Sequence, residues 1–164
     1  MAQVDDVPAL LVMALQDLHD GERAMAQRLP VVRDHVRTPA LRTWIEEDAG
    51  RSHHQRDRLA DIMRSMGAEP RGDRNIWLRA ILDDADNDAA TIAAGPLRDT
   101  ALIGALRKAK QAERVSYETA IVLARRLDLQ DALQTLTSIR DEEQAADDAL
   151  AVMLEQMNLE EETA

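Results

Sequence analysis

Four long stretches of the sequence carry apolar residues at spacings of three and four positions, which is the pattern of α-helices that bury one face. These stretches cover about residues 7–35, 39–66, 97–127 and 131–159. Proline, glycine or a short polar segment separates each stretch from the next. A shorter helical segment, about residues 74–93, lies in the long connection between the second and third stretches. A chain with this pattern buries its apolar surface by packing long helices against one another.

The order of the helices favours one arrangement. Two long helices form a hairpin, a long connection follows, and two more long helices form a second hairpin. This order is typical of the ferritin-like fold, so we expect an all-α, ferritin-like four-helix bundle with one long crossover that contains a short extra helix. Asp5 or Asp6 is a suitable cap for the first helix and Thr38 for the second. We expect a single domain over residues 1–164, with an acidic tail at 160–164.

Composition excludes several classes of function. The formal net charge is −11, so nucleic acids and anionic membranes would repel the surface, and we expect neither as a partner. No apolar run is long enough to span a bilayer, and the N-terminal segment lacks the basic region of a secretory signal. The sequence has no cysteine and therefore no disulfide or thiolate chemistry. We expect a soluble, cytoplasmic protein.

Each apolar stripe is interrupted by polar residues near the middle of its helix. Glu22 and Glu113 each stand near the centre of a largely apolar line, and Glu143 stands between Arg140 and Asp147 at the centre of the line in the last helix. The second helix carries Asp48, Ser52 and Gln55 at the equivalent place. Since mid-helix positions of antiparallel hairpins lie at similar heights, we expect these side chains to converge into one buried layer. Burying an unpaired carboxylate costs several kcal/mol, so the layer requires a positive species.

Two kinds of positive species are compatible with such a layer. In the first interpretation, two divalent cations occupy the layer, since carboxylates with an imidazole suit iron or manganese. Glu22, Glu113 and Glu143 would hold the ions, and His54 and Asp147 would complete the ligand set.

In the second interpretation no metal is present. Arg51 stands three residues before His54, where a two-metal bundle of this kind has a glutamate. Arg51, together with Arg140, would then replace the metal in a buried salt-bridge network. Tyr117, one turn beyond Glu113, fits best as a packed core residue.

Several segments resemble one known family. Residues 15–22, LQDLHDGE, are similar to the LQDLYDAE segment of the YciF-like ferritin-like stress proteins, and residues 95–102 and 141–147 resemble that family's later helices. The resemblance covers about residues 9–154. It implies a ferritin-like bundle, usually dimeric, that is associated with bacterial stress responses and has a proposed two-metal site.

Two segments depart from the family pattern. The family usually has a Glu-Thr pair where this chain has Arg51-Ser52. In the third long helix the family usually has Glu-His-Tyr-Glu, and this chain has Lys110-Gln111-Ala112-Glu113. Two acidic positions have therefore become basic.

Two functions follow from these alternatives. The first is a ferritin-like stress protein that binds iron or manganese and whose reaction, if it has one, is oxidation of Fe(II). The second is a non-enzymatic scaffold, a homodimer without metal in which Arg51 neutralises the carboxylates. Nucleophilic catalysis has no support, because no histidine is placed to activate a serine and the chain has no glycine-rich phosphate loop.

Overall fold

The computed structural model describes residues 3–71 and 74–159, and the regular structure in these residues is entirely α-helical, as predicted. The helices are α1 (Val7–His35), α2 (Pro39–Ser65), α3 (Ile76–Thr91), α4 (Pro96–Arg126) and α5 (Gln130–Gln156). Most predicted ends are correct to within about two residues. The exception is α5, which ends three residues before the predicted 159. The predicted acidic tail at 160–164 lies outside the described residues.

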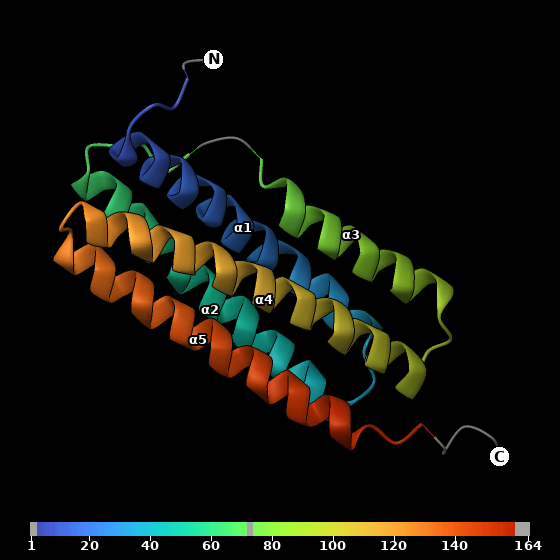
Figure 1. Cartoon of the computed structure of the whole chain (residues 1–164). Coiled ribbons are helices and arrows are strands. Elements are labelled where there is room, and N and C mark those ends of the chain that lie inside the picture. The colour runs from blue at the N-terminus through green and yellow to red at the C-terminus, as the bar shows by residue number, and fades with distance from the viewer. Residues whose placement is uncertain (1–2, 72–73, 160–164) are drawn as a thin grey trace.

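The four long helices form two hairpins that pack side by side. Helix α1 pairs with α2 and α4 pairs with α5, while α1 also contacts α4 and α2 contacts α5 (Figure 1). The short helix α3 lies outside this group, against α1 and α4. The long connection between the hairpins thus contains the predicted extra helix, and each long helix has one face directed towards a shared interior.

The predicted cap of α1 is correct, whereas the predicted side-chain cap of α2 is absent. Asp6 is the N-cap of α1, and its carboxylate accepts a 2.7 Å hydrogen bond from Ala9 N. Thr38 does occupy the N-cap position of α2, but its side chain caps no backbone N–H of that helix. The buried carboxylate of Asp99, in the first turn of α4, accepts hydrogen bonds from Thr38 N at 2.7 Å, Thr38 Oγ1 at 2.6 Å and Arg37 N at 3.1 Å. Asp99 therefore ties the second hairpin to the corner of the first.

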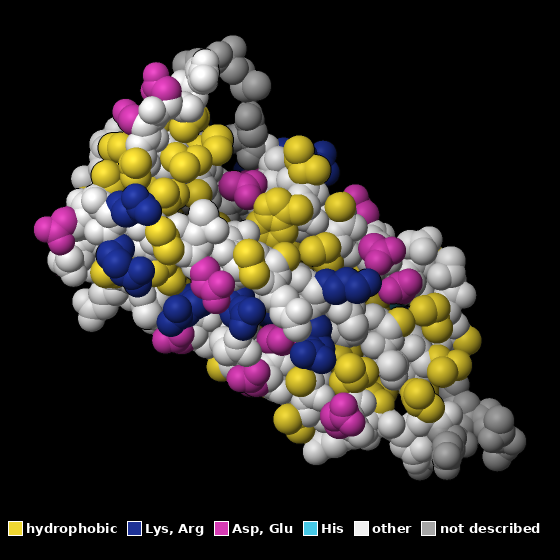
Figure 2. Space-filling view, in the orientation of Figure 1, with side chains coloured by type: hydrophobic (Ala, Val, Ile, Leu, Met, Phe, Trp, Pro, Cys, Tyr) yellow, Lys and Arg dark blue, Asp and Glu magenta, His cyan; other side chains and the backbone are white. Residues whose placement is uncertain are grey.

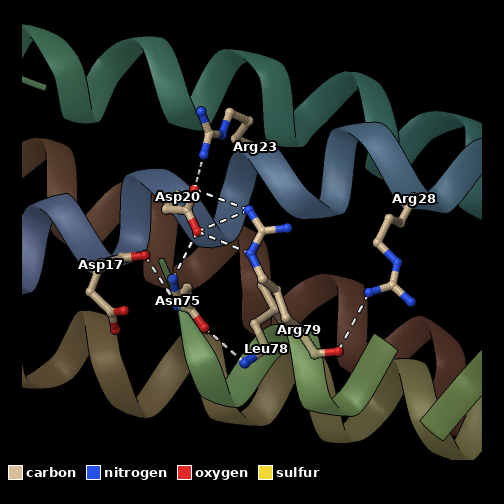
Figure 3. Close-up of polar contacts among 7 residues, drawn as sticks. All are labelled: Asp17, Asp20, Arg23, Arg28, Asn75, Leu78 and Arg79. Carbon is tan, nitrogen blue, oxygen red and sulfur yellow. Dashed lines mark hydrogen bonds and ion pairs between the residues drawn. The ribbon is translucent and has the colours of Figure 1, made fainter. Parts of the chain in front are cut away.

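A buried carboxylate on α1 anchors the start of α3 (Figure 3). Asp20 accepts a 2.8 Å hydrogen bond from Asn75 N and pairs with the guanidinium of Arg79 at 3.0 Å and with that of Arg23. Although burial alone would raise the pKa of Asp20, the bonds from Asn75, Arg79 and Arg23 outweigh burial and lower it. Asn75 also caps α3, accepting from Leu78 N at 2.8 Å.

Gly21 allows α3 to approach α1 closely. A Cβ atom at this position would lie 3.1 Å from Asn75 Nδ2 and 3.2 Å from Leu78 Cδ2. Both distances are shorter than ordinary contacts, so a larger residue would push α3 away. The neighbouring Asp17 adds a second link, because its carboxylate accepts a 2.8 Å hydrogen bond from Trp77 Nε1.

The surface carries acidic and basic side chains close together, and hydrophobic side chains gather near the N-terminal end of α1 and the start of α3 (Figure 2). Met13, Asp17, Ile76 and Trp77 contribute to a hollow of about 360 Å³ between these two helices. In the part of the chain that the structure describes, no helix is long and apolar enough to cross a membrane.

The core consists of two apolar clusters separated along the helices. The first includes Met25, Leu29 and Leu106, and the second includes Leu15, Leu59 and Leu136. On all four long helices the polar mid-helix residues fall between the two clusters. The interior therefore has a polar layer between two apolar halves.

We expect Asp99→Ala to lower the free energy of unfolding by about 1–3 kcal/mol, because it leaves the part-buried N–H groups of Arg37 and Thr38 without their acceptor. Urea denaturation measures this loss. The matched control is Asp131→Ala, which removes an exposed carboxylate from the first turn of α5. Equal losses in the two variants would contradict the role of Asp99 in holding the corner between α1 and α2.

Candidate functional site

The polar layer contains charged and polar side chains from all four long helices, none of which is more than 1% exposed. The structure brings together Glu22, Glu113 and Glu143, the three glutamates whose convergence the stripes predict. The second helix contributes its polar centre. The members are Glu22 from α1; Asp48, Ser52 and Gln55 from α2; Lys110, Glu113 and Tyr117 from α4; and Glu143 from α5.

The positive group at the centre of this layer is the ammonium of Lys110. Its Nζ atom lies 2.6 Å from Glu143 Oε2, 2.9 Å from Asp48 Oδ2 and 3.0 Å from Glu113 Oε2. The contacts lie at ion-pair distances without the alignment of hydrogen bonds, so the attraction is mainly coulombic. Burial would lower the pKa of Lys110, but the charges of Asp48, Glu113 and Glu143 raise it well above its ordinary value. Lys110 is therefore charged, and one side chain joins α2, α4 and α5.

This arrangement corrects the prediction for Arg51 and Arg140. The side chain of Arg51 is 29% exposed and reaches the layer only from its rim, where Nη1 lies 2.5 Å from Asp48 Oδ1. Arg140 pairs with its neighbour Asp141 at 2.8 Å outside the layer. A guanidinium on a mid-helix position of α2 is directed along the helix towards Asp48, whereas the flexible stem of Lys110 extends into the interior.

Two of the predicted ligands do not reach the layer. His54 is exposed on the outer face of α2. Asp147 is buried one turn beyond Glu143, but it pairs with Arg107 Nε at 2.7 Å and accepts a 3.1 Å hydrogen bond from Gln111 Nε2. The structure therefore unites three of the five predicted ligands and separates His54 and Asp147 from them.

On the side of α2 and α5, the amide of Gln55 and the ion pair between Arg58 and Glu142 border the layer. Gln55 Nε2 donates to Glu143 Oε1 at 2.8 Å and to Glu142 Oε2 at 3.0 Å. The other oxygen of Glu142 lies 2.7 Å from Arg58 Nη1. Glu143 is thus held by both Gln55 and Lys110.

Glu22 and Tyr117 form a separate pair within the layer. The Tyr117 hydroxyl donates a 2.6 Å hydrogen bond to Glu22 Oε1, whereas Glu22 Oε2 has no hydrogen-bond partner. Burial is the largest influence on Glu22 and, together with the charge of Glu143, raises its pKa to about 8, although Lys110 and Tyr117 act in the opposite direction. Tyr117 is a core residue, as predicted, with its hydroxyl committed to Glu22.

The layer contains more carboxyl groups than positive groups. Four carboxyl groups meet one ammonium and, at the rim, one guanidinium, so complete ionisation would leave two negative charges without compensation. Burial raises the pKa of Glu113 well above its ordinary value, and the charges of Glu143 and Glu22 add to this effect against that of Lys110. The raised pKa values of Glu22 and Glu113 mean that the layer favours protonation of these two groups, which reduces its excess of negative charge.

The residues present do not fit the two-metal site that the resemblance implies. An ammonium at 2.6–3.0 Å from three carboxylate oxygens occupies the space between them and repels any divalent ion placed there. The imidazole that such a site uses is absent from the layer, because His54 is exposed. Over residues 3–71 and 74–159, no group of three or more His, Cys, Asp or Glu side chains is arranged to hold a metal ion.

Lys110 departs from the family pattern, but its position in the buried layer was not predicted from the sequence. The informative signal was its spacing. Leu106, Lys110, Glu113 and Tyr117 follow one another at intervals of four, three and four residues, so they share one helix face. A stripe drawn through Ala109, Glu113 and Ser116 also has helical spacing, and it turns the expected buried face slightly away from Lys110.

We expect Lys110→Met to lower the free energy of unfolding by about 3–5 kcal/mol near neutral pH, because it leaves buried carboxylates without their cation. Urea denaturation gives the value. Lys108→Met is the matched control, since Lys108 lies on the same helix but its side chain is 67% exposed. Its ion pair with Asp84 is a long one, with Nζ 3.8 Å from Asp84 Oδ2. A loss no larger than that of the control would contradict the central position of Lys110.

The pKa of Glu22 gives a prediction for pH. Because the folded state raises this pKa from 4.5 to about 8, protonation of Glu22 favours folding below about pH 4.5, and this contribution is lost as the pH rises to about 8. Glu22→Gln mimics the protonated form of Glu22. Because glutamine has no carboxyl group to ionise, this variant keeps the stabilising contribution over the whole pH range. We expect its stability relative to the unmodified protein to rise by on the order of 3 kcal/mol between about pH 5 and about pH 8.

Urea denaturation at several pH values measures this difference, with Glu118→Gln as the control on an exposed position of α4. A difference that stays constant with pH would show that Glu22 is not held protonated.

The fold is shared with several solved structures. YcfI, a putative structural protein from Rhodopseudomonas palustris, matches with a TM-score of 0.87 and 23% identity, over 91% of this chain and 95% of that chain. The stress protein YciF from E. coli matches with a TM-score of 0.89 and 20% identity, over 93% and 97%. A protein from Xanthomonas campestris pv. campestris matches with a TM-score of 0.75 and 17% identity, over 92% of each chain.

At these identities the similarity shows the fold alone, and no curated protein matches the chain. A family model described as "Domain of unknown function (DUF892)" matches residues 7–163, almost the whole sequence. The chain therefore belongs to the DUF892 family, and the resemblance to the YciF-like proteins is confirmed.

Proposed function

We propose that this protein is a structural member of its family: a non-enzymatic, ferritin-like helical scaffold of a bacterial stress response that works without a bound metal. The observation that carries the proposal is the ammonium of Lys110 among Asp48, Glu113 and Glu143. The layer has its own cation, supplied by the chain when it folds. The proposal keeps one idea of the arginine-substituted alternative, a cation from the chain in place of a metal, but it gives the central role to Lys110 and leaves Arg51 at the rim.

The chemistry of the layer supports this function. Oxidation of Fe(II) by oxygen requires an iron ion with an open coordination position and a route for small molecules, whereas all members of this layer are enclosed. The pocket between α1 and α3 is lined by other residues, including Met13 and Trp77. A layer built this way stabilises the arrangement of the helices.

The related proteins are consistent with this function. YcfI is described as a putative structural protein, and YciF as a stress protein. We carry both descriptions to this chain as part of the proposal, together with the homodimer that the family resemblance implies.

We expect the purified protein to contain well below one ion per chain after incubation with Fe(II) or Mn(II), and a chelator to leave its melting temperature unchanged. The reason is the unfavourable energy of a divalent ion next to a buried ammonium. Elemental analysis and thermal denaturation with and without chelator give the two results. Stoichiometric metal that raises the melting temperature would overturn the proposal in favour of iron or manganese binding.

A further inference from the structure

Helix α3 covers one face of α1 along only part of its length. At the start of α3, Trp77 Nε1 donates a hydrogen bond to the carboxylate of Asp17, and Leu78 lies against Gly21. Residues seven positions apart lie on the same face of a helix. Leu10, seven positions before Asp17, therefore belongs to the face that α3 covers further along the helix, and it is 39% exposed.

The uncovered part of this face forms a groove with the first turn of α3. Two hollows that share Met13 make up the groove, one of about 360 Å³ beside α3 and one beside the N-terminal end of α1. Three of its apolar residues are well exposed: Leu10 at 39%, Met13 at 49% and Ile76 at 80%. Hydrophobic side chains gather on this part of the surface in Figure 2. We call this surface, over residues 4–17 and 74–77, the α1/α3 groove.

We propose that the α1/α3 groove is the docking site for an amphipathic helix of a partner protein, with basic residues beside its apolar face. The inference rests on the proposed function, because a scaffold without a reaction of its own acts through the proteins that it binds. Exposed apolar patches bordered by polar residues commonly mark such interaction sites.

The packing of α3 shows which kind of segment this side of α1 accepts. The buried residues of α3 follow one another at intervals of four, three and four positions: Leu78, Leu82, Ala85 and Ala89. Helix α3 thus presents one apolar stripe to α1 and α4. The part of α1 from Val7 to Asp17 is about 15 Å long, since a helix rises by about 1.5 Å per residue. A partner helix of about three turns with apolar residues at the same intervals matches this length.

The charges around the groove favour basic residues on the partner. Asp5 and Asp6 line one end and Asp17 lines the other, whereas the described residues of the lining include one guanidinium, that of Arg74. The whole chain has a formal net charge of −11. Lysine or arginine beside the apolar face of the partner would be attracted to these carboxylates. A second copy of this chain would bring the same carboxylates to the groove, so charge repulsion disfavours it as the occupant.

The test uses the full chain and a synthetic probe. The probe is a fluorescein-labelled peptide of leucine and lysine, roughly 18 residues long so that it forms a helix on its own, with the leucines on one face. Two control peptides accompany it, one with glutamate in place of lysine and one with the same composition in scrambled order. Fluorescence anisotropy at about 0.15 M salt, where surface charges are screened as in the cell, measures binding.

The two tryptophans of the sequence report where the peptide binds. Trp77 lines the groove, whereas Trp44 is 5% exposed and donates a hydrogen bond to the carbonyl of Ala146 in the core. We expect the leucine–lysine peptide to shift the indole N–H signal of Trp77 in a ¹⁵N NMR spectrum and to leave the signal of Trp44 in place.

A pair of neutral substitutions tests the apolar part of the groove. Leu10→Ser combined with Met13→Ser removes exposed apolar surface without changing the net charge, and we expect at least about tenfold weaker binding. The matched control is Val115→Ser combined with Val122→Ser, which removes exposed apolar side chains from α4 and should leave binding unchanged. If the first pair does not fold, Ile76→Ser on α3 takes its place in the comparison.

The inference is supported if the leucine–lysine peptide binds, shifts Trp77 and loses affinity in the groove variant alone. It is overturned if the peptide does not bind, leaves Trp77 unshifted, or is matched in affinity by either control peptide. Equal weakening by the groove variant and the α4 variant would also overturn it.

Analytical ultracentrifugation separates the remaining occupant, a second copy of the chain. A dimer of the unmodified protein that dissociates in Leu10→Ser/Met13→Ser would show that a second copy covers the groove, and the inference would be overturned. All of these results leave the proposed function intact. Stoichiometric metal in the unmodified protein would overturn the proposed function whether or not the peptide binds.

Discussion

The contact of one ammonium with three carboxylates fixes how the long helices of this protein meet. Lys110 lies on α4 and its partners lie on α2, α4 and α5, while Glu22 on α1 belongs to the same layer. A shift of any helix by one turn, about 5.4 Å, would leave a charge buried without its partner. Removing Lys110 from water is itself unfavourable. The layer therefore contributes less to the free energy of folding than to the selection of one alignment of the helices over shifted ones.

Much of this fold was predictable from local patterns. Apolar spacing and the break residues located the helices, and Glu22, Glu113 and Glu143 revealed the layer because each interrupts an apolar stripe. The details that depend on contacts between distant residues were not predictable. The hydrogen bonds from Thr38 to Asp99 and the anchoring of α3 by Asp20 and Arg79 both join residues more than fifty positions apart.

The identity of the central cation shows where the sequence becomes ambiguous. Arg51, Arg140 and Lys110 are all basic residues near polar positions of their helices. A difference of one residue in the stripe of α4 decides whether Lys110 faces the interior, and helical spacing fixes a direction only approximately. His54 illustrates the same limit, because a suitable spacing on α2 still leaves it on the outer face. Proteins that share this fold can therefore differ in the chemistry of the layer through a single side chain.

Lysine side-chain NMR tests the central position of Lys110 most directly, because Lys108 and Lys110 are the only lysines in the sequence. In protein labelled with ¹⁵N and ¹³C at lysine, the exposed Lys108 serves as the internal reference. We expect one ammonium signal, that of Lys110, to show slow hydrogen exchange and to stay protonated above the ordinary pKa of lysine, because carboxylates surround Lys110 and raise its pKa. Equally fast hydrogen exchange of both ammonium groups would show that Lys110 faces water, and the layer described above would lose its cation.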